Sequence, residues 1–524
     1  MLLWALQNLP EDLWTRGKLC PPNRVFQLLT SSKKVLQLVK QFRPLIPAIL
    51  NVEPKFSTPF MQEKLPRLVQ YVQPVSVAAW GKVPTHEYAG LLSNPACFDA
   101  NVFKMPDNIL YHENLSALSD ILMQASSWSS VEKMCLSGNQ ICHKRPVQET
   151  ESEDGSATVA NTRYTFFRKE TESNFSAADP FVRLLGQSTA LKTLDLSRNG
   201  LNRMDIKHLS LGLANLSTLE RLRLSNNPLG TIGVKYVMKA LNQSQPPLSV
   251  LDLASCGMSK AGCMTFADCC LQWDKLTVLN ISGNGIFPDG LFRLAQHASS
   301  MSKLSVLNVS TNRLTIPGAK VLAEEMLPHL PQLTELIAND NYFQDEGITV
   351  LSFCLQVHCP LLRRLDLAMN RFTKNAVQDL VLFLVARKET LQVLNLAHNM
   401  MYADGIAELV QFLPTSLREL NLSANSVRTA AIGAAIGDVL HTIPEISVLN
   451  LSFNKLGICG CRQIVDKCEE LDFTQIHLIF CYRNLQVRDS RGKEWLESHI
   501  DEVEEWVSDK YRITLIENYD LDKI

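Results

Sequence analysis

The stretch LQVLNLAHNMM at residues 391–401 decides the fold, because much of the chain repeats it. Leu391, Leu394 and Leu396 occupy its first, fourth and sixth places, and Asn399 occupies its ninth. The same L-x-x-L-x-L-x-x-N/C-x-L phrase starts at Val131, Leu191, Leu219, Leu248, Leu276, Leu304, Leu333, Leu362, Leu417 and Ile446, and in degenerate form at Phe473. Such repetition predicts a stack of similar structural units rather than a globular domain around one central core.

The distance between copies indicates what each unit contains. From Asn199 to Cys481 the ninth places lie 26–29 residues apart, which leaves room for an α-helix after each strand. Helical spacing of apolar residues is visible at Val377, Leu380, Val381 and Leu384, and again at Ile406, Leu409, Val410 and Leu413. Six residues after the Asn or Cys most units have a glycine, where the helix start is expected to pack against neighbouring backbone. These glycines are Gly233, Gly262, Gly290, Gly318, Gly347, Gly405 and Gly460.

This combination resembles the ribonuclease-inhibitor type of leucine-rich repeat, the subtype also found in Ran GTPase-activating protein. The resemblance implies a right-handed α/β horseshoe with a parallel sheet on its concave side and helices on its convex side. The leucines then point into a narrow core, and each ninth-place Asn satisfies backbone groups where the strand ends, so that the Asn residues form a ladder. No unit can bury its apolar face alone, so the ends need caps.

The extent of the phrase predicts three regions. Residues 113–485 form the leucine-rich repeat solenoid, and residues 486–524 form a C-terminal cap with a helix at 493–506 and a strand at 511–516. Residues 1–112 lack the phrase and are expected to be a mainly helical N-terminal region that caps the first repeat. Within them, residues 13–52 contain seven Lys or Arg and no acidic residue. This basic stretch leaves two alternatives open, a binding helix for acidic protein or nucleic acid and a mitochondrial transit peptide.

An insertion interrupts the repeats. Asn139 and Asn199 lie 60 residues apart, 31 more than one unit of 29, and the surplus falls in a loop at about residues 142–176. Its first half, residues 149–163, is acidic and typical of a mobile loop. Three aromatic residues follow beside Arg168, and they form a candidate docking element for a partner or for the protein's own concave face: Tyr164, Phe166 and Phe167.

Further candidate contacts lie where each strand becomes a loop. Side chains that alternate with the buried leucines face the concave side and are small and polar in most units, whereas the residue just before the Asn or Cys varies. Loop residues on a rigid scaffold often carry recognition, and aromatic and arginine residues dominate binding hot spots. The candidate partner-binding residues are therefore Arg198, Arg223, Asp340, Met369, His398 and Phe453, with Tyr164, Phe166 and Phe167 of the insertion. The alternative reading, ordinary exposed loop residues, stays open for each.

Composition narrows the functional classes. Of the 524 residues 46% are hydrophobic and 20% charged, with a net charge of −2, so no global charge favours nucleic acid or a membrane surface. No apolar run reaches the roughly 18–20 residues needed to cross a bilayer. The 14 cysteines lack the regular spacing of a disulfide-stapled secreted domain, which predicts a cytoplasmic protein with reduced thiols and a mitochondrial location as the alternative. The set Cys459, Cys461, Cys468 and Cys481 does not have the spacing of paired zinc knuckles, so neither a metal nor another cofactor is predicted.

The sequence contains none of the common catalytic motifs, such as a phosphate-binding glycine loop, HExxH or a nucleophile elbow. We therefore predict a non-catalytic scaffold that binds one or more proteins, within a cytoskeletal or ribonucleoprotein assembly, without a small-molecule substrate or a membrane. The resemblance implies a first alternative, a GTPase-activating protein for a Ran-like GTPase that supplies Arg168 in trans, with Arg163 in reserve. A second alternative, an assembly factor that associates with a ribonucleoprotein in the cytoplasm or in mitochondria, depends on the basic N-terminal segment.

Overall fold

The computed structural model describes residues 49–52, 76–79, 102–104, 111–124, 131–139, 141–142, 173–269, 273–471, 476–481 and 512–516. The chain divides into two compact units. Unit 1 comprises the described residues up to Gly257 together with Cys269, and unit 2 comprises Met258–Asp268 and the described residues from Trp273 onward. The predicted N-terminal helix, the insertion residues 143–172 and the predicted helix at 493–506 lie outside the described residues.

Unit 1 is a parallel sheet whose strands follow the order of the sequence. The strands are β1 (Ile49–Val52), β2 (Ser76–Ala79), β3 (Val102–Lys104), β4 (Lys133–Cys135), β5 (Thr193–Asp195), β6 (Arg221–Arg223) and β7 (Val250–Asp252). The helices are α7 (His112–Gln124), α8 (Pro180–Gly186), α9 (Arg203–Leu213) and α10 (Gly230–Ser244). The leucine phrase does not reach β1, β2 and β3, which extend the sheet pairing towards the N-terminus.

Unit 2 repeats the same strand-then-helix order. Its parallel strands are β8 (Val278–Asn280), β9 (Val306–Asn308), β10 (Glu335–Ile337), β11 (Arg364–Asp366), β12 (Val393–Asn395), β13 (Glu419–Asn421), β14 (Val448–Asn450), β15 (His477–Cys481) and β16 (Arg512–Ile516). Its α-helices are α11 (Ser259–Ala267), α12 (Phe287–Ala295), α13 (Thr315–Lys320), α14 (Gln344–His358), α15 (Val377–Ala386), α16 (Tyr402–Val410), α17 (Ala431–Val439) and α18 (Gly457–Glu470). Short 3₁₀ turns and one π-helix, η7 (Val321–Met326), connect several of them.

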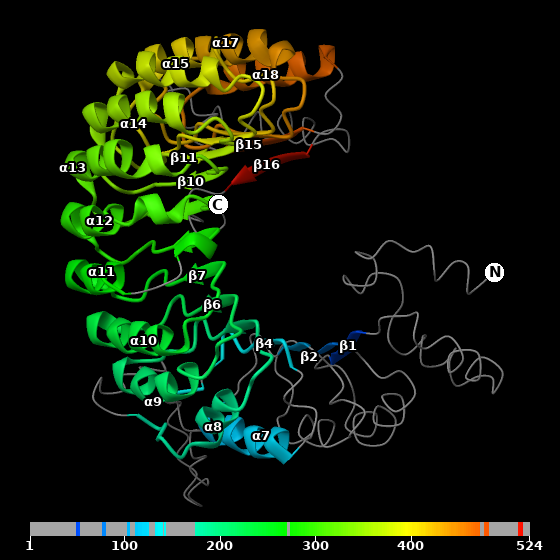
Figure 1. The fold of residues 1–524 in the computed structure, drawn as a ribbon. Helices are drawn as coiled ribbons and strands as arrows, with labels where there is room; N and C mark the ends of the chain where they lie inside the picture. Colours follow the sequence, from blue (N-terminus) through cyan, green and yellow to red (C-terminus); the bar gives the residue numbers. More distant parts are fainter. Residues whose placement is uncertain are drawn as a thin grey trace, which may run out of the picture. The chain divides into compact units, whose positions relative to one another are not determined.

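Within each unit the described helices lie on one side of the sheet, and no described helix lies on the other side, which is called the sheet face below (Figure 1). The phrase explains the core between the two layers, since Leu391, Leu394 and Leu396 are all 0% exposed. The predicted α/β leucine-rich repeat architecture, with a parallel sheet and a layer of helices, is confirmed. The strand expected at 511–516 is also present, as β16 paired with β15.

The expected asparagine ladder is present and joins neighbouring repeats. Asn199 Nδ2 donates to the carbonyl oxygens of Leu136 and Leu196, each at 2.9 Å. The side chain of the next ladder residue, Asn227, accepts from the backbone N–H groups of Asn199 and Leu201 through Oδ1, each at 3.0 Å. Each buried amide therefore satisfies backbone groups of its own repeat and of the preceding one, which fixes the stacking of the two.

Cys256 takes the ladder position in one repeat. Its Sγ lies 3.3 Å from the carbonyl oxygen of Leu224, and burial raises the pKa of the thiol to about 12. A neutral thiol can donate one weak hydrogen bond, whereas an asparagine amide offers two donors and an acceptor. This rung of the ladder is consequently weaker than its neighbours.

The recurrent glycines avoid close contacts, as the sequence indicates, but most of the contacts involve side chains rather than backbone. A Cβ on Gly233 would lie 2.9 Å from Leu229 Cβ, and one on Gly347 would lie 2.9 Å from Ala319 Cβ of the preceding repeat. Backbone is the obstacle between α17 and α18, where a Cβ on Gly433 would collide with the main chain of Gly460. Gly433 does not belong to the recurrent set, because it lies eight residues after Asn425 rather than six.

Candidate functional site

The residue before each ladder position forms the rim of the sheet face, and its backbone conformation is the same in every repeat whose rim residue lies between Gly138 and Phe453. Its φ is 55° at Arg198, 51° at Asp340, 57° at Met369, 54° at His398 and 57° at Phe453. Two repeats have glycine at this place, which adopts the left-handed region without strain, whereas other residues bear a cost of roughly 1–2 kcal/mol. Because these repeats share the turn, the fold requires the conformation, and only the side chain distinguishes one rim position from another.

Backbone hydrogen bonds hold the rim in place. The N–H of Met369 donates to the carbonyl oxygen of Ala397 at 2.9 Å, and the N–H of His398 donates to that of Ser423 at 2.8 Å. Each rim residue is thereby tied to the next repeat. The side chains start from a fixed backbone, so a partner that contacts them would have to order little of the main chain.

On the sheet face of unit 2, one arginine connects three strands. Arg364 in β11 lies 3.5 Å from Glu335 in β10, measured from Nε to Oε2, and its Nη2 lies 4.0 Å from Oε2 of Glu419 in β13. All three side chains are between 40% and 47% exposed, so the ion pairs are open to solvent and contribute little to stability. These residues, with Asp366 and the rim residues Asp340, Met369 and His398, are called the β10–β13 patch below.

Asp366 lies at the centre of this patch. Its Oδ2 accepts from Asn339 Nδ2 at 3.2 Å and Asn395 Nδ2 at 3.0 Å, and its Oδ1 accepts from the N–H of Ala368 at 3.0 Å. Burial raises the pKa of Asp366, and these hydrogen bonds together with nearby Arg364 offset part of that rise. The network spans three adjacent repeats and fixes the polar floor of the patch.

The rim beside the patch presents apolar and aromatic groups. The side chain of Met369 is 47% exposed. The rings of His398 and Phe453 lie 6.5 Å apart between centroids, with only Ala424 as the rim residue of the intervening repeat. His398 is exposed, yet partial burial of its ring lowers its pKa. The structure thus brings His398 and Phe453 together.

Two features of this surface were not expected from the sequence. Glu335, Arg364 and Glu419 occupy the third place of the phrase, which also faces away from the helices, whereas the expected contacts of the repeats lie at the fifth and eighth places. The second feature is Arg371, whose guanidinium lies 4.3 Å from the centroid of the Tyr342 ring. The available signal was the charged residues at a third place that is valine in five other copies of the phrase.

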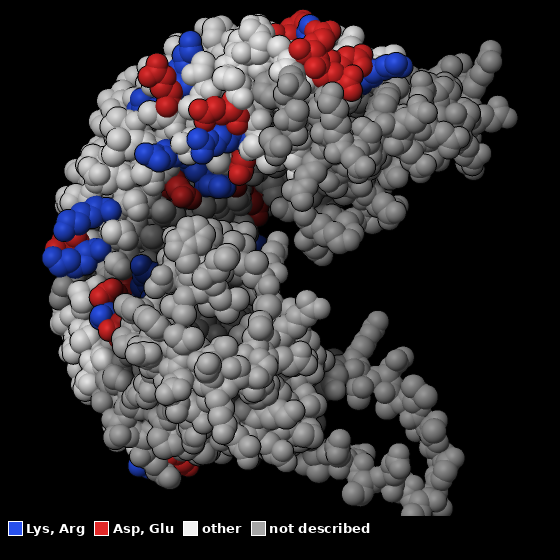
Figure 2. Space-filling view, turned by 90° about the vertical axis from the view of Figure 1, so that its right-hand side faces the viewer, with Lys and Arg blue, Asp and Glu red and all other residues white. Residues whose placement is uncertain are grey.

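Unit 1 has a smaller polar group on its sheet face. Arg223 in β6 lies 4.0 Å from Asp195 in β5, measured from Nη1 to Oδ2. Burial raises the pKa of the neighbouring Asp252, and Arg223 offsets part of that rise. Arg198 occupies the rim of the same unit, held by a hydrogen bond of 2.9 Å from its N–H to the carbonyl oxygen of Ser225. Basic and acidic side chains are interspersed over the described part of the surface that Figure 2 presents.

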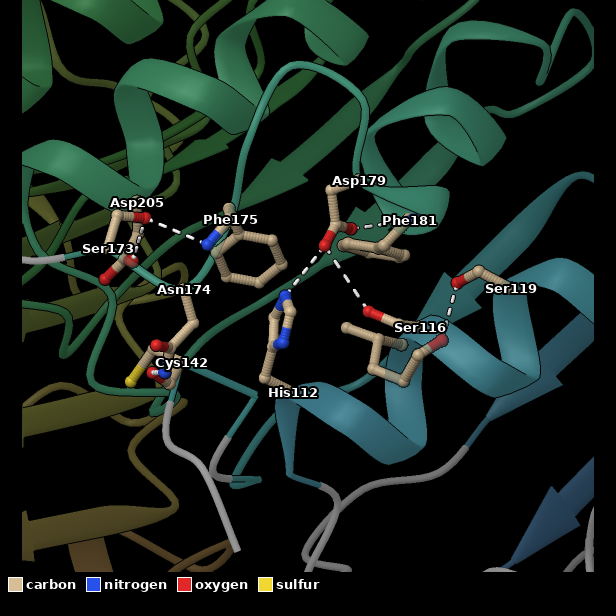
Figure 3. Close-up of polar contacts among 11 residues, drawn as sticks. His112, Ser116, Ser119, Cys142, Ser173, Asn174, Phe175, Asp179, Phe181 and Asp205 are labelled. Atoms are coloured by element: carbon tan, nitrogen blue, oxygen red, sulfur yellow. Dashed lines mark hydrogen bonds and ion pairs between the residues drawn. The ribbon is translucent and has the colours of Figure 1, made fainter.

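The ends of the insertion are fastened to one place in unit 1 (Figure 3). Asn174 Nδ2 donates to the carbonyl oxygen of Cys142 at 2.9 Å, which joins the two ends of the insertion. Ser173 Oγ donates to Asp205 Oδ1 of α9 at 2.8 Å. The candidate residues Tyr164, Phe166, Phe167, Arg163 and Arg168 lie outside the described residues.

A histidine–carboxylate pair lies beside this anchor. His112 Nε2 and Asp179 Oδ2 are 2.7 Å apart, and Ser116 Oγ donates to the same carboxylate oxygen at 3.3 Å (Figure 3). Asp179 also accepts from the N–H of Phe181 at 2.9 Å, which caps the N-terminus of α8. Since the serine bonds to the aspartate rather than to the histidine, these side chains do not form a nucleophile–base pair. They join α7 to α8.

The cysteines considered for zinc do not assemble into a site in the described part of the chain, which contains no metal-binding group of three or more His, Cys, Asp or Glu. Cys461 and Cys468 are buried in α18, and burial raises the pKa of Cys468 to about 12, whereas Cys459 is exposed. Among the described residues no helix combines the length and apolar character that a bilayer crossing requires.

Comparisons with known proteins found one matching family model and similar solved structures. A family model described as the PRAME C-terminal domain matches residues 178–330, less than half of the chain. One similar solved structure, titled as the complex of Rad7 and Elc1 in yeast, is 16% identical over 66% of this chain and 79% of that chain, with a TM-score of 0.44.

An internalin from Listeria monocytogenes is 17% identical over 71% of this chain and 85% of its own, with a TM-score of 0.37. A comparison with curated protein sequences found no match. The repeated phrase, the stacked strand–helix repeats and the asparagine ladder, together with the family match, identify the chain as a leucine-rich repeat protein.

Proposed function

We propose that this protein is a non-catalytic scaffold that binds a partner protein across the β10–β13 patch and its rim. The observation that carries the proposal is the position of Arg364. Its side chain lies between two exposed carboxylates, on a sheet whose strands are hydrogen bonded to one another. With strands about 4.8 Å apart, four strands span roughly 14 Å, a width suited to the central part of a protein contact.

The charge pattern favours a protein over nucleic acid. A nucleic-acid surface needs basic side chains that outnumber acidic ones along the phosphate backbone. In the β10–β13 patch Arg364 is accompanied by Glu335, Glu419, Asp366 and Asp340. Exposed Met369 adds an apolar contact beside these charges, and mixed polar and apolar contacts are typical of protein interfaces.

The proposal also covers the subtype of the repeat, further contact residues and the location of the protein in the cell. A repeat of 26–29 residues with a helix in the unit supports the ribonuclease-inhibitor type. Phe453, Arg198 and Arg223 are proposed as additional contacts on the rim and sheet face, and a cytoplasmic location is proposed on the basis of the free cysteines among the described residues.

Site-specific photocrosslinking tests the binding surface. A photoreactive amino acid replaces Met369 on the rim, and in a matched variant it replaces Gln378, which is exposed on the helix side in α15. We expect one discrete protein adduct from position 369 that is absent from position 378. Equal labelling from both positions, or adducts from position 378 alone, would contradict the proposal.

The GTPase-activating alternative depends on Arg168 and is tested separately. Purified protein is added to a Ran-type GTPase, and GTP hydrolysis is compared with that of an Arg168→Ala variant. Stimulation that disappears in the variant would replace the scaffold proposal by an enzymatic one, whereas no stimulation by the unaltered protein would remove the alternative.

A further inference from the structure

A second surface, on the helix side of unit 2, is unusually apolar. The exposed helix position twelve residues after the ladder residue is polar in most repeats, as at Lys239, Asp268, Gln296, Glu324, Gln411 and Asp466. It is apolar in the consecutive helices α14 and α15, where Phe353 is 65% exposed and Leu382 is 54% exposed. The same helices expose Val357 by 54% and Val385 by 53%.

These four residues, called the α14–α15 face below, form two short rows. Phe353 and Val357 are spaced i, i+4 on α14, and Leu382 and Val385 are spaced i, i+3 on α15. Residues with such spacing lie on one side of a helix. The helices α14 and α15 lie next to each other in the helix layer (Figure 1). Because Phe353 and Leu382 hold the same place in their two repeats, we expect the two rows to border a common strip of surface. A single apolar side chain on a surface needs no explanation, but four on neighbouring helices do.

Polar contacts at both ends hold the two helices together. Near the N-terminal ends, Thr349 Oγ1 of α14 donates to Asp379 Oδ2 of α15 at 2.7 Å. Near the C-terminal ends, the buried side chain of Arg387 donates from Nη2 to the carbonyl oxygens of Leu355 at 3.0 Å and Gln356 at 2.7 Å. The α14–α15 face is therefore pre-organised, which lowers the entropic cost of binding there.

Carboxylates flank the α14–α15 face on both sides. Glu324 and Glu325 are exposed on η7, which precedes α14, and Glu408 is exposed on α16, which follows α15. None of these three forms an ion pair with another described residue. At the C-terminal end of α15, Lys388 and the adjacent Glu389 balance each other in charge. An apolar strip between acidic borders complements a segment with an apolar centre and basic flanks.

We propose that the α14–α15 face is a second protein-docking surface that binds an amphipathic helix with basic flanks from a partner protein. The apolar face of such a helix, with residues at i, i+3, i+4 and i+7, would cover the two rows, and its lysines or arginines would lie near Glu324, Glu325 and Glu408. This surface lies on the helix side and is independent of the β10–β13 patch.

The test uses the full chain and a defined probe. The probe is a fluorescent 20-residue helical peptide with leucines at i, i+3, i+4 and i+7 of successive turns and lysines on the flanks; a second peptide has glutamates instead. We expect the lysine peptide to bind in a fluorescence anisotropy titration and the glutamate peptide to bind at least tenfold more weakly. Leu382→Ser combined with Phe353→Ser should weaken binding of the lysine peptide by about tenfold or more.

Matched variants make the result specific. Leu211→Ser alters the equivalent position of α9, where leucine is 50% exposed, and should leave peptide binding unchanged, as should Arg364→Glu on the sheet face. Glu324→Gln combined with Glu408→Gln should weaken binding of the lysine peptide by about two- to fivefold and reduce the salt dependence of that binding. Exposed Leu→Ser changes are expected to alter folding stability by only about 0.5 kcal/mol.

Several outcomes would overturn the proposal. The first is that the lysine peptide does not bind. The second is that Leu211→Ser weakens its binding as much as the combined Phe353→Ser and Leu382→Ser change does. The third is that both peptides bind equally well. Self-association that Leu382→Ser abolishes would show that a second copy covers the α14–α15 face, and binding to phosphatidylcholine–phosphatidylserine vesicles that Leu382→Ser abolishes would show a lipid surface instead.

Discussion

Replacement of one ladder asparagine tests the basis of the fold. Asn370 is 0% exposed, and its Nδ2 donates to the carbonyl oxygens of Ala338 at 3.0 Å and Leu367 at 3.1 Å. Its Oδ1 accepts from the N–H groups of Asn341 at 3.1 Å and Phe343 at 3.3 Å. Asn370→Ala removes these four hydrogen bonds and a fifth one of 3.2 Å from Nδ2 to the carbonyl oxygen of Ala368. At about 1 kcal/mol for each of the four shorter or inter-repeat bonds, the free energy of unfolding should fall by about 4 kcal/mol.

Cysteine at the same position provides an internal calibration, because Cys256 already occupies one rung. A thiol can restore a weak donor to a carbonyl but not the amide's full set of contacts. Asn370→Cys should therefore be destabilising by about half as much, roughly 2 kcal/mol. Gln378→Ala, an exposed change on α15, is the control and should stay within about 0.5 kcal/mol.

Urea unfolding followed by circular dichroism measures the loss, and hydrogen exchange locates it. Because repeat proteins can unfold in parts, exchange at the amides of Asn341 and Phe343 should accelerate before that of distant repeats. A loss below about 1 kcal/mol for Asn370→Ala, or equal effects of Ala and Cys, would refute the view that the amide ladder holds neighbouring repeats together.

Three further predictions concern packing, a buried arginine and a buried acid. Gly433→Ala should lower the free energy of unfolding by about 1–3 kcal/mol, because its Cβ would meet the backbone of Gly460. Gly186→Ala is the control and should be tolerated, because its Cβ would meet only Asn215 Nδ2 at 3.4 Å. Equal losses of stability for the two variants in thermal unfolding would contradict this prediction. Arg387→Met should lower the free energy of unfolding by about 2–3 kcal/mol, because the carbonyl groups of Leu355, Gln356 and Cys359 lose their hydrogen-bond donor. An unchanged free energy in chemical unfolding would show that water replaces the donor. For Asp366, whose pKa is raised in the folded protein, the folded state binds the proton more tightly than the unfolded state, so its contribution to stability should decline as pH rises from about 4 through the folded pKa. The difference in unfolding free energy between unaltered protein and Asp366→Asn should follow this pH dependence, and a difference that is constant or grows in the opposite direction would contradict the assignment.

The repeats could be predicted from sequence because one phrase fixes both the strand and the ladder. Leu391, Leu394 and Leu396 are buried as their places predict, and the period leaves room for α15 and α16. The strands β1, β2 and β3 were not predicted, because their segments lack the leucines of the phrase while still pairing in parallel through backbone hydrogen bonds. Backbone pairing does not require particular side chains, so a side-chain pattern cannot detect it.

The candidate surfaces were less predictable. The rim was expected, yet the contact between His398 and Phe453 depends on which side chain the intervening repeat contributes, and this is Ala424. Arg364 was missed because its importance comes from carboxylates that lie 29 residues before and 55 residues after it in the sequence. The α14–α15 face was missed because Phe353 and Leu382 continue an apolar helix pattern, and only the structure shows that they are exposed.

The most direct test of the central claim is the affinity of the partner captured from position 369 for charge-reversed variants. Arg364→Glu reverses a charge on the β10–β13 patch, and Arg293→Glu reverses one of equal exposure on α12, where Arg293 pairs with Asp268 at 2.7 Å. We expect Arg364→Glu to raise the Kd by at least tenfold, because it places a third carboxylate beside Glu335 and Glu419, and Arg293→Glu to leave the Kd unchanged. An unchanged Kd for Arg364→Glu, or an equal rise for both variants, would contradict binding on the sheet face.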